Sequence, residues 1–103
     1  MIISNIIFDK KKFIISFDND EEIKISEDTL VNFGLYKGQE VEEEFVENLK
    51  FEDEKTEALL LSYKFLQRNK TKKQLVDHLY KNKIQREIID TILPILEEKK
   101  YLN

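Results

Sequence analysis

A capping box at residues 71–74 marks the start of one helix in this chain. Thr71 is followed three residues later by Gln74, and at this spacing each side chain can bond a backbone N–H in the first turn of a helix. Apolar residues then recur at helical intervals, at Leu75, Val76, Leu79 and Tyr80. Charged residues occupy the other side, so the helix has a single apolar stripe that must be buried against partners. This stretch is therefore expected to be part of a helix bundle.

Two flanking segments supply the partners. Within residues 53–68, apolar residues occur at helical spacing at Ala58, Leu59, Leu61, Phe65 and Leu66. Within residues 84–99 they occur at Ile88, Ile89, Ile92, Leu93, Ile95 and Leu96. Pro94 removes a backbone donor from the second run, so that helix should kink or restart there, and the unbroken periodicity favours a kink. The sequence predicts a three-helix unit over residues 53–103.

The first quarter of the chain has the composition of β-strands. β-branched and aromatic residues dominate segments 2–8, 13–17 and 22–26, and the last two alternate with a period of two. Polar turns at residues 9–12 and 18–21 separate these segments. We predict an antiparallel meander of three short strands.

Two short helices are expected between the meander and the three-helix unit. Ser26 caps the first, Glu27 and Asp28 favour its dipole, and Gly34 is placed to end it in the left-handed conformation. The second covers residues 42–48 and exposes its glutamates. Residues 1–52 are thus predicted to be a β-rich module with short helices, and residues 53–103 a three-helix repeat. The fold class is α+β.

The net charge of −4 conceals two oppositely charged halves. Residues 1–57 hold seven lysines and sixteen acids, a net charge of −9, whereas residues 58–103 hold ten Lys or Arg and five acids, a net charge of +5. From Lys64 to Arg86 there are eight basic residues and one acid, Asp77. Such a basic surface commonly meets phosphate groups or an acidic protein face, although lysines also simply solvate helix surfaces.

Five of these cations are expected to converge at the corner between the first two helices of the repeat. In chain order they are Lys64, Arg68, Lys70, Lys72 and Lys73. Lys64 and Arg68 would share one helix face at a spacing of four residues, and the other three follow in the loop and the next helix. We predict this corner, together with Lys81 and Arg86, as the surface that binds a protein partner or nucleic acid.

The sequence has no residue combination typical of catalysis or of a cofactor site. There is no cysteine, and with a single histidine neither a metal cluster nor a Ser-His-Asp triad is supported. We expect His78 to be a partly exposed helix residue. The segment from Asp18 resembles the start of a calcium loop, but Ile23 and Thr29 stand where that loop needs Gly and Glu. A binding or regulatory module is expected, with no enzymatic activity, cofactor or metal.

No apolar run approaches the roughly 20 residues that span a bilayer, and the N-terminus lacks the basic start and apolar run of a signal peptide. We expect a cytoplasmic protein without a membrane partner. The pattern carries no signal for an oligomeric state.

The frame that begins at Leu61–Leu75 and the segment 27–41 together resemble the RecX family, regulators of the RecA recombinase. The frame from Leu61 to Leu75, followed by Leu79, Ile84, Ile88-Ile89, Leu93, Leu96 and the final Lys100-Tyr101-Leu102-Asn103, is similar to that family's three-helix repeat. Residues 27–41 look like its N-terminal segment. Lys83 and Lys100 stand where the family has glycines, and Asn103 stands where an acidic pair leads onward. The family usually carries three repeats in tandem, whereas one is present here.

The resemblance implies a protein that binds the RecA filament on DNA and modulates it, typically by inhibiting ATP hydrolysis and strand exchange. The partner implied is the RecA nucleoprotein filament, with DNA as a further candidate. An alternative is a free-standing DNA-binding module of the helix–turn–helix type, for which only Gln85 and Arg86 could read bases. A third interpretation is an adaptor that acts through its acidic half.

Overall fold

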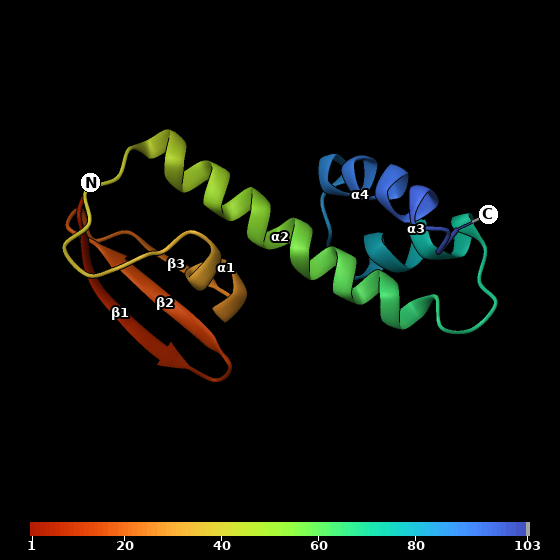
Figure 1. Ribbon diagram of the computed structural model, residues 1–103, viewed down its shortest axis with the longest axis horizontal. Helices are drawn as coiled ribbons and strands as arrows, with labels where there is room; N and C mark the ends of the chain where they lie inside the picture. Colours follow the sequence, from red (N-terminus) through yellow and green to blue (C-terminus); the bar gives the residue numbers. More distant parts are fainter. Residues whose placement is uncertain (103) are drawn as a thin grey trace. The chain divides into compact units, whose positions relative to one another are not determined.

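The computed structural model describes residues 1–102, so Asn103, the last residue of the family-like C-terminal stretch, lies outside the described residues. Contacts divide the chain into two compact units, one from Met1 to Asp53 and one from Glu54 onward. The elements are β1 (Ile3–Asp9), β2 (Lys12–Phe17), β3 (Glu22–Ile25), α1 (Glu27–Asn32), α2 (Glu43–Phe65), α3 (Lys72–Lys81) and α4 (Arg86–Glu98) (Figure 1). The predicted α+β fold is confirmed.

The strands form the predicted antiparallel meander, in the order β1-β2-β3. Phe8 pairs with Phe13 and Asp9 with Lys12, so a two-residue turn joins β1 to β2. Both turn residues, Lys10 and Lys11, have positive φ, at 48° and 77°. These signs are those of a type I′ turn, whose twist matches that of the flanking strands.

One face of the sheet packs on the helical segments of the first unit. The buried core consists of Ile3, Ile15, Phe17, Ile25, Val41 and Val46. Partly buried side chains from α1, α2 and the loop between them, Leu30, Leu35 and Phe45, pack against it. Alternation along β2 places Ile15 and Phe17 on this face, as expected for a half-buried strand. The apolar pattern of the sequence therefore determined which sheet face is covered.

α1 has the boundaries that its sequence predicts. Ser26 is the N-cap and accepts the Thr29 N–H, while Phe33 is the C-cap and Gly34 follows with φ of 61°. The Leu35 N–H donates to the Leu30 carbonyl and the Gly34 N–H to the Val31 carbonyl. This pattern is a Schellman motif, which favours glycine because its central residue is left-handed.

The prediction of two helices over residues 42–48 and 53–68 is wrong, because α2 runs without a break from Glu43 to Phe65. No Gly or Pro separates the two predicted helices. Val46, Leu49 and Asp53 recur at helical spacing and are all buried, so one continuous face spans the predicted gap. The helix also ends three residues earlier than predicted, since residues 66–68 form a turn.

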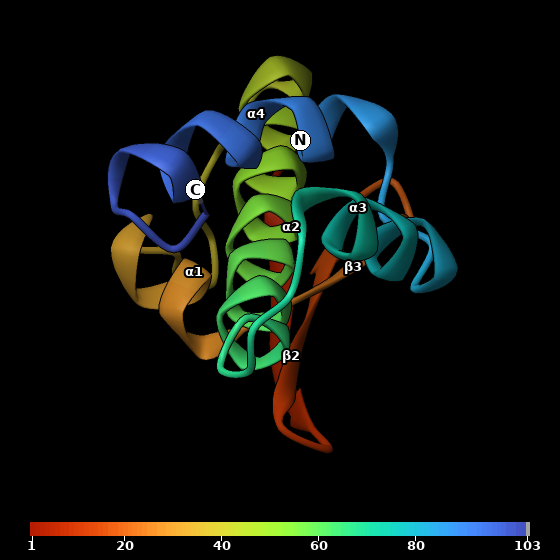
Figure 2. The same ribbon diagram turned by 90° about the vertical axis from the view of Figure 1, so that its right-hand side faces the viewer.

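The second unit combines the C-terminal part of α2 with α3 and α4 (Figure 2). Its buried apolar side chains are Ala58, Leu75, Leu79, Ile88, Ile89, Ile92, Leu96 and Leu102. Tyr80, which was assigned to the apolar stripe of α3, is exposed because it lies at the edge of that stripe. α4 begins at Arg86, two residues after the predicted start, and continues through Pro94 without restarting.

α3 and α4 both end in Schellman motifs whose left-handed residue is a lysine. Lys83 and Lys100 each have φ of 63°. After α3, the N–H groups of Lys83 and Ile84 donate to the carbonyls of Tyr80 and Leu79. Tyr101 makes the matching bond to the Leu96 carbonyl after α4. Lysine thus occupies two positions at which glycine is strongly favoured.

Candidate functional site

The corner between α2 and α3 has a fixed backbone. The Thr71 N–H donates to Gln74 Oε1 at 2.8 Å, and the Gln74 N–H donates to Thr71 Oγ1 at 3.1 Å. The predicted capping box is therefore confirmed. At the other side of the corner, the Leu66 N–H continues the helix pattern by donating to the Ser62 carbonyl. These bonds satisfy part of the backbone groups that the two helix ends leave without intrahelical partners.

Aromatic contacts join the two helices at this corner. The Phe65 ring, at the end of α2, stacks on the His78 ring of α3 with centroids 4.2 Å apart and planes at 16°. Lys70 Nζ lies 5.2 Å from the Phe65 centroid, within the range of a cation–π contact. His78 is half-buried, as predicted, and its carbonyl accepts the Asn82 side-chain amide at 2.8 Å. The His78 side chain therefore contributes to the packing of α3 on the end of α2.

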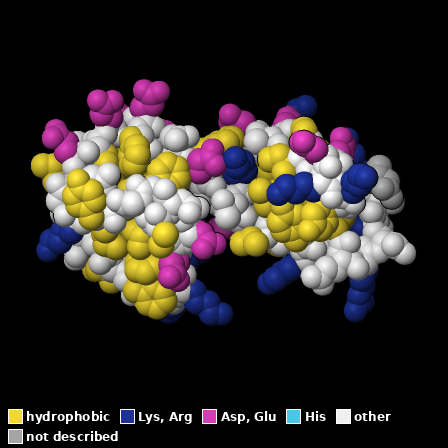
Figure 3. Space-filling model, in the orientation of Figure 1, with side chains coloured by type: hydrophobic (Ala, Val, Ile, Leu, Met, Phe, Trp, Pro, Cys, Tyr) yellow, Lys and Arg dark blue, Asp and Glu magenta, His cyan; other side chains and the backbone are white. Residues whose placement is uncertain are grey.

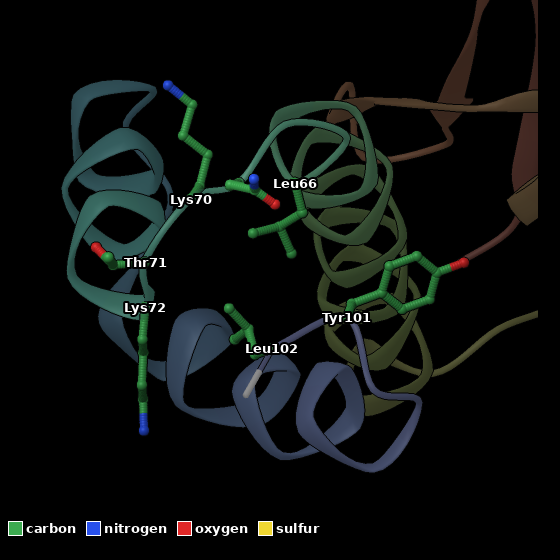
Figure 4. A pocket seen from close by; sticks show the side chains of 7 residues that line it. Leu66, Lys70, Thr71, Lys72, Tyr101 and Leu102 are labelled. Carbon is green, nitrogen blue, oxygen red and sulfur yellow. The ribbon is translucent and has the colours of Figure 1, made fainter.

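A shallow cavity of about 340 Å³ lies beside the capping box, lined by Leu66, Asn69, Lys70, Thr71, Lys72, Tyr101 and Leu102. Figure 4 shows that Leu66 and Leu102 lie in the space between the end of α2 and the start of α3. The ammonium groups of Lys70 and Lys72 point away from each other (Figure 4). The lining mixes apolar side chains with a larger share of polar surface that includes Lys70 and Lys72, which suits a polar or negatively charged group of a partner.

The seven predicted site residues differ in their existing contacts. Lys72 Nζ lies 3.0 Å from Glu97 Oε1, an ion pair that joins α3 to α4. Arg86 Nε lies 3.7 Å from Asp90 Oδ2 one turn further along α4. Five side chains are exposed and have no ion pair with any residue in the range 1–102; these are Lys64, Arg68, Lys70, Lys73 and Lys81. Their charges are available to a partner.

The structure separates the seven residues into two groups. Lys72 is the first residue of α3 and Lys81 is the last. With a rise of about 1.5 Å per residue, their backbones lie about 13 Å apart along the helix axis. Lys81 and Arg86 therefore belong to the opposite end of α3 from the other five. We use the name basic corner for Lys64, Arg68, Lys70, Lys72 and Lys73 only.

The expectation that Lys64 and Arg68 share one helix face is wrong. α2 ends at Phe65, so Arg68 lies in the bend that follows, and the spacing rule for helix neighbours no longer applies. Two further contacts of this unit escaped sequence analysis, the pairing of Lys72 with Glu97 and the packing of the Tyr63 ring on Tyr101 at 4.7 Å. Both join residues far apart in the chain, for which local spacing carries no signal.

The charge asymmetry of the sequence follows the two units. Residues 1–53 hold six lysines and fourteen acids, a net charge of −8, and residues 54–103 hold eleven Lys or Arg and seven acids, a net charge of +4. Acidic side chains gather over the start of α2 (Figure 3). In the second unit, dark blue side chains project from several elements (Figure 3). Long-range attraction of a polyanion thus favours the second unit.

Within residues 1–102, no set of three or more His, Asp or Glu side chains is arranged to hold a metal ion. The same residues include no helix with the length and apolar character required to cross a bilayer.

Curated proteins resemble this chain over about nine-tenths of its length. No protein-family model matches it. A curated protein of Streptococcus pyogenes, named regulatory protein RecX, is 31% identical over 95 residues, which cover 91% of this chain and 37% of that protein. The regulatory protein RecX of Leuconostoc mesenteroides is 30% identical over 93 residues, or 89% of this chain and 35% of that protein.

A solved structure shares the fold. A crystal structure of regulatory protein RecX superposes with a TM-score of 0.66 and 23% sequence identity, over 99% of this chain and 52% of that one. The chain therefore spans little more than a third of the length of the curated relatives it matches. Over that span, sequence and fold agree with the resemblance first seen in the repeat frame, and the chain belongs to the RecX family of regulatory proteins.

Proposed function

We propose that this chain binds the RecA recombinase filament on DNA and modulates, most simply inhibits, its recombination and ATPase activities. Membership of the RecX family supports the proposal, because the sequence resemblance implies the RecA filament as partner. Regulation in this proposal works by binding, without a catalytic step, and takes place in the cytoplasm. It applies to the span that this chain covers, which is one helical repeat with its β-rich module.

The basic corner is the surface that we assign to the filament. Lys64, Arg68 and Lys73 are exposed and have no ion pair within residues 1–102, and Lys73 lies in the first turn of α3, which the capping box fixes. Preorganised cations bind phosphates or carboxylates without first losing an internal partner. This combination of available charge and rigid backbone is the observation that supports the assignment. Lys70 and Lys72 contribute from the rim of the cavity.

A helix–turn–helix reader of duplex DNA receives less support. Such a module inserts the first residues of its recognition helix into the major groove. α4 offers Gln85 and Arg86 at that position, and the Arg86 guanidinium lies beside Asp90. A carboxylate next to the only candidate arginine would be brought close to the DNA phosphates, which disfavours binding.

A pull-down at physiological salt separates the two functions. RecA filaments assembled on immobilised single-stranded DNA should retain the chain, and immobilised duplex DNA without RecA should not. The ATPase rate of the filament should fall as the chain is added. Equal retention on bare duplex DNA, with an unchanged ATPase rate, would contradict the proposal and favour the DNA reader.

A further inference from the structure

The tip of the β1–β2 hairpin concentrates positive charge in an otherwise acidic unit. Lys10 and Lys11 are adjacent and exposed, and neither has an ion pair with any residue in the range 1–102. The unit to which they belong carries a net charge of −8. Because screening limits surface electrostatics to about 8–10 Å at physiological salt, the hairpin tip acts on a ligand through its own lysines.

An exposed aromatic residue, Phe8, precedes these lysines by two positions in the same hairpin. The Phe8 side chain is 62% exposed although it is on the face of the sheet that carries the core. Its ring packs on Phe13 with centroids 5.1 Å apart and planes at 58°. Phe13 is itself packed against the core of the unit. Phe8 is thus held by one neighbour, while most of its ring surface remains open to a ligand.

The turn backbone fixes the position of the two lysines. Both have positive φ, a conformation that costs a side-chain-bearing residue and for which Asn-Gly is the favoured pair. The turn therefore holds both lysines at the tip of the hairpin with a defined backbone.

We propose that this hairpin tip binds single-stranded nucleic acid, with one base stacked on the Phe8 ring and the neighbouring phosphates held by Lys10 and Lys11. An exposed aromatic face next to cations is the combination by which proteins bind single strands without reading their sequence. A lipid surface fits less well, because Ile7 and Phe8 point to opposite faces of the strand and so offer one large apolar side chain per face. The site is separate from the basic corner.

The test uses the full chain and a fluorescent oligothymidylate of about 20 nucleotides, longer than the binding site of a small fold, with no RecA present. The variant Lys10→Asn/Lys11→Gly removes both charges and gives the turn its favoured sequence, so folding is preserved. In an anisotropy titration against salt, loss of two phosphate contacts should reduce the slope of log affinity by about 1.4. Phe8→Leu keeps an apolar side chain and should weaken binding about tenfold by removing the stacking surface.

Lys37→Asn is the matched control, since Lys37 is another exposed turn lysine of the same unit, and it should leave affinity and slope nearly unchanged. Unchanged binding in the Lys10→Asn/Lys11→Gly variant overturns the proposal, as does a wild type that fails to bind the oligonucleotide. Anionic vesicles provide the remaining comparison. If the turn variant lost affinity for vesicles alone, the tip would be a membrane contact and the proposal would be wrong. Because RecA is absent, these outcomes are independent of filament binding.

Discussion

At the residue scale, Lys83 has a backbone conformation that is unfavourable for lysine. It occupies the left-handed position of a Schellman motif with φ of 63°, where a Cβ crowds the backbone. Lys83→Gly should therefore raise the free energy of unfolding, by up to about 1 kcal/mol, part of the gain being offset by the greater freedom of glycine in the unfolded chain. Urea denaturation measures the change. Asp77→Gly, at an exposed position in the middle of α3, is the control and should destabilise by about 1 kcal/mol. A loss of stability in Lys83→Gly would contradict this account.

Asp53 is the residue whose role the sequence concealed. Its Oδ1 accepts hydrogen bonds from the Ser26 N–H (3.0 Å), the Ser26 hydroxyl (3.0 Å) and the Thr29 hydroxyl (2.6 Å), and the residue is buried. The pattern placed it at the start of a helix, because nothing local links it to a cap 27 residues earlier. The carboxylate joins α2 to the N-terminus of α1.

Replacing Asp53 should show that its acceptor oxygen matters more than its volume. Asp53→Ala leaves buried donors without a partner and should cost about 2–3 kcal/mol of unfolding free energy. Asp53→Asn keeps one oxygen in place and should cost less. Thermal and urea unfolding of both variants provide the measurement, and equal losses would show that the three hydrogen bonds are not the cause.

At the scale of secondary-structure elements, sequence patterns predicted the boundaries most reliably where neighbouring residues form the turn or cap. The capping box at Thr71, the end of α1 at Gly34 and the meander were all predicted, because each depends on contacts within a few residues. The break inside α2 was predicted wrongly, because the helices expected over residues 42–48 and 53–68 are one helix. Burial of Val46, Leu49 and Asp53 along one face keeps the helix continuous there.

The continuity of α2 can be tested at Lys50, in the middle of the predicted gap. Lys50→Pro should cost about 3 kcal/mol or more if the residue lies inside a helix, since a donor is lost and the ring clashes with the preceding turn. Lys50→Ala is the control. It removes only the exposed pair with Glu47 at 3.5 Å and should change stability by a few tenths of a kcal/mol. A proline variant as stable as the alanine variant would restore the two-helix interpretation.

At the scale of the whole molecule, α2 contributes buried residues to both units, Leu49 to the first and Ala58 to the second. We therefore propose that the β-rich module and the three-helix repeat do not fold independently. Residues 54–103 expressed alone should unfold at a lower temperature than the same residues in the full chain, because a single core of this size rarely supplies more than about 3–5 kcal/mol. Circular dichroism melting compares the two. An unchanged midpoint for the isolated repeat would contradict the proposal.

The fold could be inferred from residue patterns, because it depends on apolar spacing that runs through the chain, and the family from the resemblance of two stretches to its known members. The arrangement of the residues in the candidate site, by contrast, could not be inferred from the sequence. Whether Lys72 is paired depends on Glu97, and whether Arg68 lies on a helix depends on where α2 ends. The sequence alone thus identified the residues of the basic corner but did not show which of them have no ion pair and can bind a partner.

Salt-dependent binding to the RecA filament tests the central claim most directly. Lys64→Glu/Arg68→Glu/Lys70→Glu reverses three charges of the basic corner, and Glu42→Lys/Glu43→Lys/Glu44→Lys reverses three exposed acids of the other unit as a matched control. The corner variant should bind more weakly, with the slope of log affinity against log salt reduced by roughly one unit per lost phosphate contact, and with a melting midpoint lowered only by the loss of the Lys70 contact with Phe65. The acidic variant should show a smaller change. Equal filament affinities for the wild type and both variants would contradict the assignment of the basic corner.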